Sequence, residues 1–433
     1  MGAQSRLIPY HLPLRFFVAA ALFHVAAWLL LTVGHADIAG YAGGPGIVLA
    51  SLHALTLGAL AMTAMGAAYQ LLNVATGITT GLAMGRFDVA SISSWLYIPG
   101  TVLLVAGMAD GNNTAMLLGG GLVVSGLIAF AVIIGNIFYR TVALKATMRH
   151  GWAALVCMVF LAVAGLVLIV DFELGFLGTS ALPERADLAF SHAILGGFGF
   201  MGLLVLGFSY ILIPMFALSP APNERQSGLS LSLILCGLAL AVPAALAGNK
   251  LALLLAAAIG LAGVAVHLMI MRKVLREGMK KRLGMSFVMV RSGWIALPLS
   301  IGIGGLAAVA PETFNLPPLF IFILIFGWLL TFLTGILQRI LPFLTSMHAH
   351  KLGQRAPRLS EMGDQGITLK MHAVCHGGAL LLVSAGIVGD VDALILIGGL
   401  TGSLGAAAFL WFTIGVGKLV VGFYAKDKRA QHP

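Results

Sequence analysis

The chain has 433 residues, of which 60% are hydrophobic and only 9% are charged, and its mean hydropathy is +1.02. This composition excludes a soluble globular fold and indicates a protein embedded in a lipid bilayer, because one core cannot bury so much apolar surface. The net charge of +10 reflects basic residues at membrane boundaries, and we predict no nucleic-acid partner. The three cysteines all lie in apolar segments, so no disulfide framework is expected.

Twelve apolar segments are long enough to cross a membrane, which takes about 20 residues per helix. They cover residues 14–34, 47–76, 91–109, 114–139, 152–171, 187–218, 228–247, 250–271, 285–309, 317–345, 370–389 and 391–424. We therefore predict an all-α polytopic membrane protein in which residues 1–433 form a single transmembrane domain. The first segment spans about 18 residues and is predicted to be a retained helix rather than a cleaved signal peptide.

The basic residues predict the orientation of these helices. If the N-terminus lies in the cytoplasm, every Lys and Arg except Arg185 and Lys250 lies at or near the cytoplasmic side. We therefore expect both termini to be cytoplasmic, with the inner (plasma) membrane of a bacterium as the location.

A pair of glycines recurs in the second, sixth and tenth spans: Gly58 and Gly66, Gly199 and Gly207, Gly327 and Gly335. Tyr69, Tyr210 and Gln338 each follow the second glycine by three residues, and the second glycines lie 141 (207 − 66) and 128 (335 − 207) residues apart. Glycines at this spacing also occur wherever membrane helices pack closely. Because polar positions keep step with them, we predict three pseudo-repeats of four helices, at about 14–150, 151–282 and 283–425.

A subunit of twelve helices in three four-helix arcs resembles subunit I of the haem-copper oxidase superfamily. The segments "HAILGGFGFMGLLVLGFSYILIPMF" (192–216) and "GWLLTFLTGILQRILPFL" (327–344) are more similar to the smaller NnrS-type haem- and copper-containing membrane proteins of nitric-oxide defence. The resemblance implies a b-type haem, with copper as a further candidate. It also implies electron transfer or a nitric-oxide or redox stress response, with a cytochrome, a quinol or another redox subunit as partner.

The chain departs from the oxidase pattern in two spans. The oxidases have a histidine pair in the seventh span and another in the tenth, whereas residues 228–247 and 317–345 contain no histidine. A complete oxygen-reducing binuclear centre is therefore not expected. We predict neither terminal oxidase nor nitric oxide reductase activity of the conventional kind.

Six of the twelve histidines lie within apolar segments, where a buried polar side chain is expected to be functional: His24, His53, His192, His267, His372 and His376. His53 and His192 enter from the outer side and lie about 9 Å down their helices. The resemblance makes His53 a haem ligand and His192 a ligand to a metal or to haem. However, His53 precedes its glycine by five residues and His192 by seven, which places them on different helix faces in an ungapped alignment.

A second, inner site is a further prediction. His372 and His376 share one helix face and, with His267 at a similar depth, are candidate ligands for copper or zinc. A polar helix end at the membrane interface is the alternative. His24 is either a ligand or a packing residue. The other histidines, at positions 11, 35, 150, 348, 350 and 432, are expected to face solvent or lipid headgroups.

Arg339 and Lys418 are candidates for pairing with haem propionates, or else mark the membrane interface. Two other functions remain open on the sequence. One is a twelve-helix secondary transporter, against which the four-helix period argues, since such transporters are built from six-helix halves. The other is an accessory or assembly subunit without a cofactor.

Overall fold

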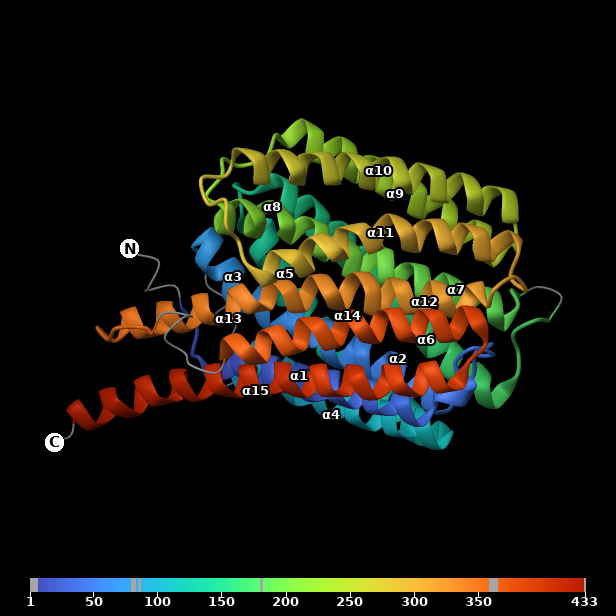
Figure 1. Cartoon of the computed structure of the whole chain (residues 1–433), viewed down its shortest axis with the longest axis horizontal. Helices are drawn as coiled ribbons and strands as arrows, with labels where there is room; N and C mark the ends of the chain where they lie inside the picture. Colours follow the sequence, from blue (N-terminus) through green and yellow to red (C-terminus); the bar gives the residue numbers. More distant parts are fainter. Residues whose placement is uncertain (1–6, 79–82, 85–86, 180–181, 358–364, 432–433) are drawn as a thin grey trace.

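The protein is a bundle of long helices that lie side by side (Figure 1). The computed structural model describes residues 7–78, 83–84, 87–179, 182–357 and 365–431. Within these residues, twelve helices are long and apolar enough to cross a membrane, and they coincide with the twelve predicted segments. The prediction of a helical, multi-pass membrane protein is confirmed.

Nine spans are single α-helices: α1 (His11–Val33), α4 (Val89–Asp110), α5 (Asn113–Arg140), α6 (Lys145–Leu174), α9 (Glu224–Leu246), α10 (Lys250–Glu277), α11 (Met285–Val309), α14 (Gln365–Gly389) and α15 (Asp392–Gln431). The other three spans each change from α-helix to π-helix and back. These are α2 (Ile47–His53), η3 (Ala54–Ala61) and α3 (Met62–Thr76); α7 (Arg185–Ile194), η4 (Leu195–Gly202) and α8 (Leu203–Ala217); and α12 (Leu316–Phe322), η5 (Ile323–Leu330) and α13 (Thr331–Lys351).

The three π-helical segments share their length and their place relative to the glycine pairs. Each has eight residues, and its fifth residue is the first glycine of the pair: Gly58, Gly199 or Gly327. The segments begin at residues 54, 195 and 323, so they are 141 (195 − 54) and 128 (323 − 195) residues apart. Long π-helices are rare and occur mostly at functional sites.

The three spans that contain π-helix form the centre of the bundle. Within their most apolar windows, 67%, 78% and 94% of the residues are buried, against at most 50% in any other span. The second glycine of each pair lies against the preceding span. A Cβ added to Gly66 would lie 2.9 Å from the Phe16 Cβ, and one added to Gly207 would lie 2.6 Å from the His150 Cβ. A Cβ added to Gly335 would lie 2.9 Å from the Ser286 carbonyl oxygen. These glycines therefore permit close helix packing, as the simpler interpretation of the pattern expects.

Several helices extend beyond the apolar segments that predict them. α6 begins at Lys145, seven residues before position 152, and α10 and α13 continue to Glu277 and Lys351. Basic residues and other good helix formers continue α10 and α13 past their apolar segments. α10 ends directly before Gly278, and α13 ends two residues before Gly353. The structure also contains a pair of antiparallel strands of two residues each, β1 (Ala83–Met84) and β2 (Phe87–Asp88).

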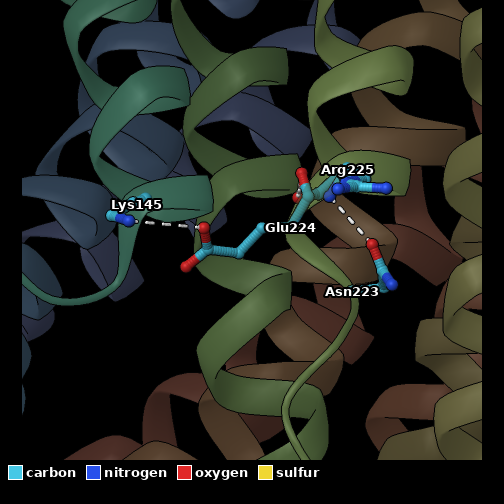
Figure 2. A network of polar contacts seen from close by, with 5 residues as sticks. Lys145, Asn223, Glu224 and Arg225 are labelled. Atoms are coloured by element: carbon cyan, nitrogen blue, oxygen red, sulfur yellow. Dashed lines mark hydrogen bonds and ion pairs between the residues drawn. The ribbon is translucent and has the colours of Figure 1, made fainter.

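Some polar contacts at the helix ends are exposed to solvent. Figure 2 shows the start of α6 beside the start of α9, where Lys145 Nζ lies 3.7 Å from Glu224 Oε2. Asn223 caps α9, because its side-chain oxygen accepts a hydrogen bond of 2.8 Å from the backbone N–H of Arg225. Such exposed ion pairs contribute little to stability, so the bundle is held by helix packing.

Candidate cofactor and metal sites

His53 and His192 lie opposite each other near one end of the bundle. His53 is the last residue of α2, directly before the π-helical segment η3, and His192 lies in α7, three residues before η4. The two ring centroids are 6.3 Å apart, and the ring planes are inclined by 27°. The structure thus brings these two histidines together, although they are 139 (192 − 53) residues apart in sequence.

Each of the two rings has a nitrogen available for a ligand. The Nδ1 of His53 donates a hydrogen bond of 3.1 Å to the Leu49 carbonyl, since a carbonyl can only accept, and this leaves the Nε2 lone pair free. The Nδ1 of His192 is buried and has no hydrogen-bond partner among the described residues. A ring held through one nitrogen with the other left free is the usual state of a metal-ligating histidine.

Both histidines line an apolar cavity of about 460 Å³. Its walls come from α1, α2, η3, α4, α5, α6, α7, η4, α12 and η5, and the side chains around it are mainly Leu, Ile, Val, Ala, Met and Phe. Ser51 and Thr56 contribute hydroxyl groups to this lining. Small-molecule and cofactor sites are typically cavities of about 300–1,000 Å³ with few polar groups, and this cavity has that character.

Tyr41 and Arg185 are further polar groups in the cavity wall. The Tyr41 hydroxyl donates a hydrogen bond of 2.9 Å to the Gly44 carbonyl. Burial raises the pKa of Tyr41 to about 12, against the opposite effect of the Arg185 charge, so the phenol is neutral at physiological pH. Arg185 Nη1 lies 2.5 Å from Asp171 Oδ2. Sequence analysis assigned neither Arg185 nor Tyr41 to a site, because nothing in the sequence shows that these two positions, 144 (185 − 41) residues apart, line one cavity.

A second group of histidines lies within the bundle, between α1 and α14. His24, His372 and His376 are at most 2% exposed. The ring centroids of His24 and His372 are 5.7 Å apart, and those of His372 and His376 are also 5.7 Å apart. His372 and His376 lie together as their spacing predicts, but their histidine neighbour is His24.

The expected neighbour, His267, belongs to a third group. Its Nδ1 lies 3.0 Å from the Tyr210 hydroxyl, and the Tyr210 ring centroid is 5.2 Å from those of both His267 and His150. His267 has no ring contact with His372 or His376 among the described residues, so the structure does not bring together the three residues of the predicted inner site. α10, which carries His267, packs mainly against α9 and α11, whereas α14, which carries the other two, packs mainly against α15.

Two histidines predicted to face solvent or headgroups are buried instead. His150 is fully buried because α6 begins five residues before it, which places it a turn inside the helix against Gly207. His348 is 2% exposed, and its Nδ1 lies 2.9 Å from the Tyr424 hydroxyl, because α13 continues past it. The predictions for His11 and His350 hold, since both side chains are exposed. His35 is partly exposed, and His432 lies outside the described residues.

Arg339 is engaged in helix packing. Its Nε donates a hydrogen bond of 2.8 Å to the Ser286 hydroxyl, and its Nη2 donates to the Leu283 carbonyl. These bonds tie α13 to the start of α11. Arg339 is therefore a structural residue in this arrangement, and Arg185 is the arginine that lines the cavity. Lys418, the other candidate for propionates, is exposed on α15.

Comparisons with known proteins identify no relative. No protein-family model matches the sequence, and no curated protein matches it either. Within the part of the chain that the structure describes, no three or more His, Cys, Asp or Glu side chains are already grouped closely enough to hold a metal ion. A function must therefore be argued from the histidine pair and its cavity.

Proposed function

We propose that this chain is a haem-binding electron-transfer protein of the bacterial inner membrane, with His53 and His192 as the two axial ligands of a b-type haem. The observation that carries the proposal is the pair of imidazoles, from spans distant in sequence, that face one another in a large apolar cavity.

The separation of the two rings fits ligation of one metal ion from opposite sides. Two imidazoles at a metal-nitrogen distance of about 2.0 Å place their ring centroids about 6 Å apart. The observed separation is 6.3 Å, and each ring has an unengaged nitrogen. The buried, unpaired Nδ1 of His192 is costly in an apolar setting unless a ligand occupies it.

The polar groups of the cavity suit a haem in a second respect. A haem is largely apolar but carries two propionate groups, and an arginine pairs well with carboxylates. Arg185 supplies that charge at the cavity wall, with Tyr41 as a neutral hydroxyl beside it. We propose these two residues as the propionate end of the site.

Ligation by two histidines favours electron transfer over reaction with oxygen. A haem would supply one-electron chemistry there, and His53 and His192 would both hold its iron, which favours electron transfer over binding of a substrate. We propose a membrane quinol, a cytochrome or another redox subunit as the electron donor. A role in nitric-oxide or redox stress response is consistent with such an electron carrier.

Three observations support the proposed pseudo-repeat of four helices. The π-helical segments recur at the same offsets as the glycine pairs, each contains its glycine at the same position, and each second glycine lies against the preceding span. We further propose that both termini face the cytoplasm, because this orientation puts almost all basic residues on that side.

The test is the reduced-minus-oxidised optical spectrum of the detergent-purified protein, with a pyridine haemochrome assay for haem content. We expect a b-type spectrum in the wild type and at least tenfold less haem in His53→Ala and His192→Ala. His350→Ala removes an exposed histidine and serves as the control, with unchanged haem content. Full haem content in both cavity variants would refute the ligand assignment, and a wild type without haem from haem-replete cells would refute the function.

A further inference from the structure

We propose that His24, His372 and His376 bind one copper(I) ion at a site separate from the His53 and His192 cavity. This site lies between α1 and α14, which carry the three ligands, and it goes beyond the proposed haem function without depending on it. The seventh span, where the oxidases keep copper ligands, contributes nothing to it.

Hydrogen bonds leave a free lone pair on two of these rings. The Nδ1 of His372 lies 3.1 Å from the Gly405 carbonyl, which can only accept, so this nitrogen carries the proton and Nε2 carries the lone pair. The Thr331 hydroxyl donates to the Phe326 carbonyl at 3.0 Å and therefore accepts from His376 Nε2, which is 2.7 Å away. The lone pair of His376 is thus on Nδ1.

These lone pairs have no partner in the folded chain. The Nε2 of His372, the Nδ1 of His376 and both ring nitrogens of His24 are buried without a hydrogen bond among the described residues. Three adjacent buried imidazoles with four unpaired nitrogens would be a heavy cost in a membrane helix bundle, and a shared metal ion would satisfy three of them, one on each ring. The fixed tautomers of His372 and His376 resemble those that backbone and hydroxyl groups impose on metal-ligating histidines.

The three rings are not in ligating positions as they stand, but two of their three separations are close to those that one shared ion requires. Three imidazoles that each place a nitrogen about 2.0 Å from one metal ion have ring centroids roughly 5–5.5 Å apart. The observed separations are 5.7 Å for both neighbouring pairs. No hydrogen bond holds the His24 ring in place, so it can rotate toward the other two.

The space beside His24 is much smaller than the cavity of His53 and His192. The cavity that His24 lines, to which neither His372 nor His376 contributes, has a volume of about 10 Å³, whereas the cavity of His53 and His192 has about 460 Å³. A volume of about 10–15 Å³ holds roughly one water-sized particle. The two groups of histidines are therefore suited to different ligands.

The surroundings favour a monovalent ion. Neither α1 nor α14 contains an Asp or Glu, and the contacts of the three rings include the aromatic rings of Trp28 and Phe409. Burying a divalent charge without an anionic ligand is far more costly than burying a single charge. Imidazole nitrogen binds copper well, and structural zinc almost always takes four ligands, so copper(I) fits three neutral imidazoles best.

The experiment measures copper(I) binding by the purified full-length protein under anaerobic conditions, in competition with a chromogenic copper(I) chelator. We expect the wild type to bind one copper(I) at this site and to lose at least 100-fold in affinity in His24→Leu, His372→Leu and His376→Gln. Thr331→Val removes the group that fixes the His376 tautomer and should weaken binding about tenfold to 100-fold. His348→Ala and His350→Ala, which alter the other adjacent histidines, are controls with unchanged affinity.

Haem content and the elution volume of each variant in detergent separate this proposal from the first. Loss of copper(I) binding in His24→Leu, His372→Leu and His376→Gln, with unchanged haem content and elution volume, supports the site. The variants His53→Ala and His192→Ala should instead lose haem and keep copper(I) binding. Wild-type affinity in His372→Leu and His376→Gln would overturn the proposal. Copper lost only in the His348 and His350 variants, or zinc bound as tightly as copper(I), would also overturn it.

Discussion

Asp171 and Arg185 form an ion pair that joins the end of α6 to the start of α7 beside the histidine cavity. The Arg185 Nη1 lies 2.5 Å from Asp171 Oδ2, and the backbone N–H of Leu177 donates a hydrogen bond of 2.7 Å to Asp171 Oδ1. The Asp171 side chain is 5% exposed and that of Arg185 is 37% exposed. The Asp171 carboxylate is therefore enclosed where the end of α6 meets the start of α7.

The Asp171 and Arg185 pair should stabilise the loop measurably. We expect Asp171→Asn and Arg185→Gln each to destabilise the protein, with a coupling energy of about 1–2 kcal/mol in a double-mutant cycle, because the carboxylate is buried although the arginine is partly hydrated. Thermal unfolding in detergent gives the measurement. The control is the exposed pair of Lys273 and Glu277, 3.9 Å apart, whose coupling should not exceed about 0.5 kcal/mol. Equal couplings in the two cycles would contradict a structural role for the Asp171 pair.

The second glycine of each pair should tolerate no side chain. A Cβ at Gly335 would lie 2.9 Å from the Ser286 carbonyl oxygen and 3.1 Å from the Val290 backbone nitrogen, so Gly335→Ala must move α11 away from α13. We expect a loss of about 1–3 kcal/mol, typical of overpacking. Gly121 in α5 has nothing within 4 Å of its Cβ position, and Gly121→Ala should stabilise the helix by about 0.5–1 kcal/mol. Similar melting temperatures for the two variants would show that this close packing is not needed.

Membrane orientation is testable with single cysteines at opposite ends of α11. Glu312 follows this helix and Lys280 precedes it, both are exposed, and the 25 residues of α11 would span roughly 37 Å. We expect a membrane-impermeant maleimide to label Glu312→Cys in intact spheroplasts and Lys280→Cys only after lysis. The unmodified protein controls for the native Cys157, Cys236 and Cys375, which lie within membrane helices. Labelling in the reverse order would place both termini outside.

The sequence predicted the helices well because each apolar segment must bury its own backbone hydrogen bonds in lipid, which is a local requirement. It also identified His53 and His192 as candidate ligands. What it could not predict is which faces meet. The positions of the two histidines relative to their glycines differ by two residues, which on a helix rotates one side chain by about 200°. That difference suggests different helix faces, yet the two ring centroids lie 6.3 Å apart.

The same limit explains the errors over the inner histidines. The neighbours of His267 and His372 depend on how α10 and α14 pack, which hydropathy does not encode. The burial of His150 depends on where α6 begins, and the signal available in the sequence was the run of good helix formers from Lys145 onward. With that start, His150 lies inside the helix and next to the repeat position Tyr210.

Exchange of one axial ligand gives a sharper test of the haem proposal than its removal. A methionine in place of one histidine is expected to keep the haem bound and to raise its midpoint potential, on the order of 100 mV, because a thioether stabilises the reduced iron. We therefore expect His192→Met to retain haem and to shift the potential upward in a spectroelectrochemical titration.

Leu166→Met is the matched control for His192→Met. It places a thioether in the same cavity wall with little change in volume and leaves both histidines intact, so the potential should stay within experimental error of the wild type. An unchanged potential in His192→Met would mean that His192 does not ligate the iron, because replacing an axial imidazole must alter the stability of its two oxidation states. A shift of equal size in both variants would instead trace the effect to cavity polarity and would remove His192 from the ligand set.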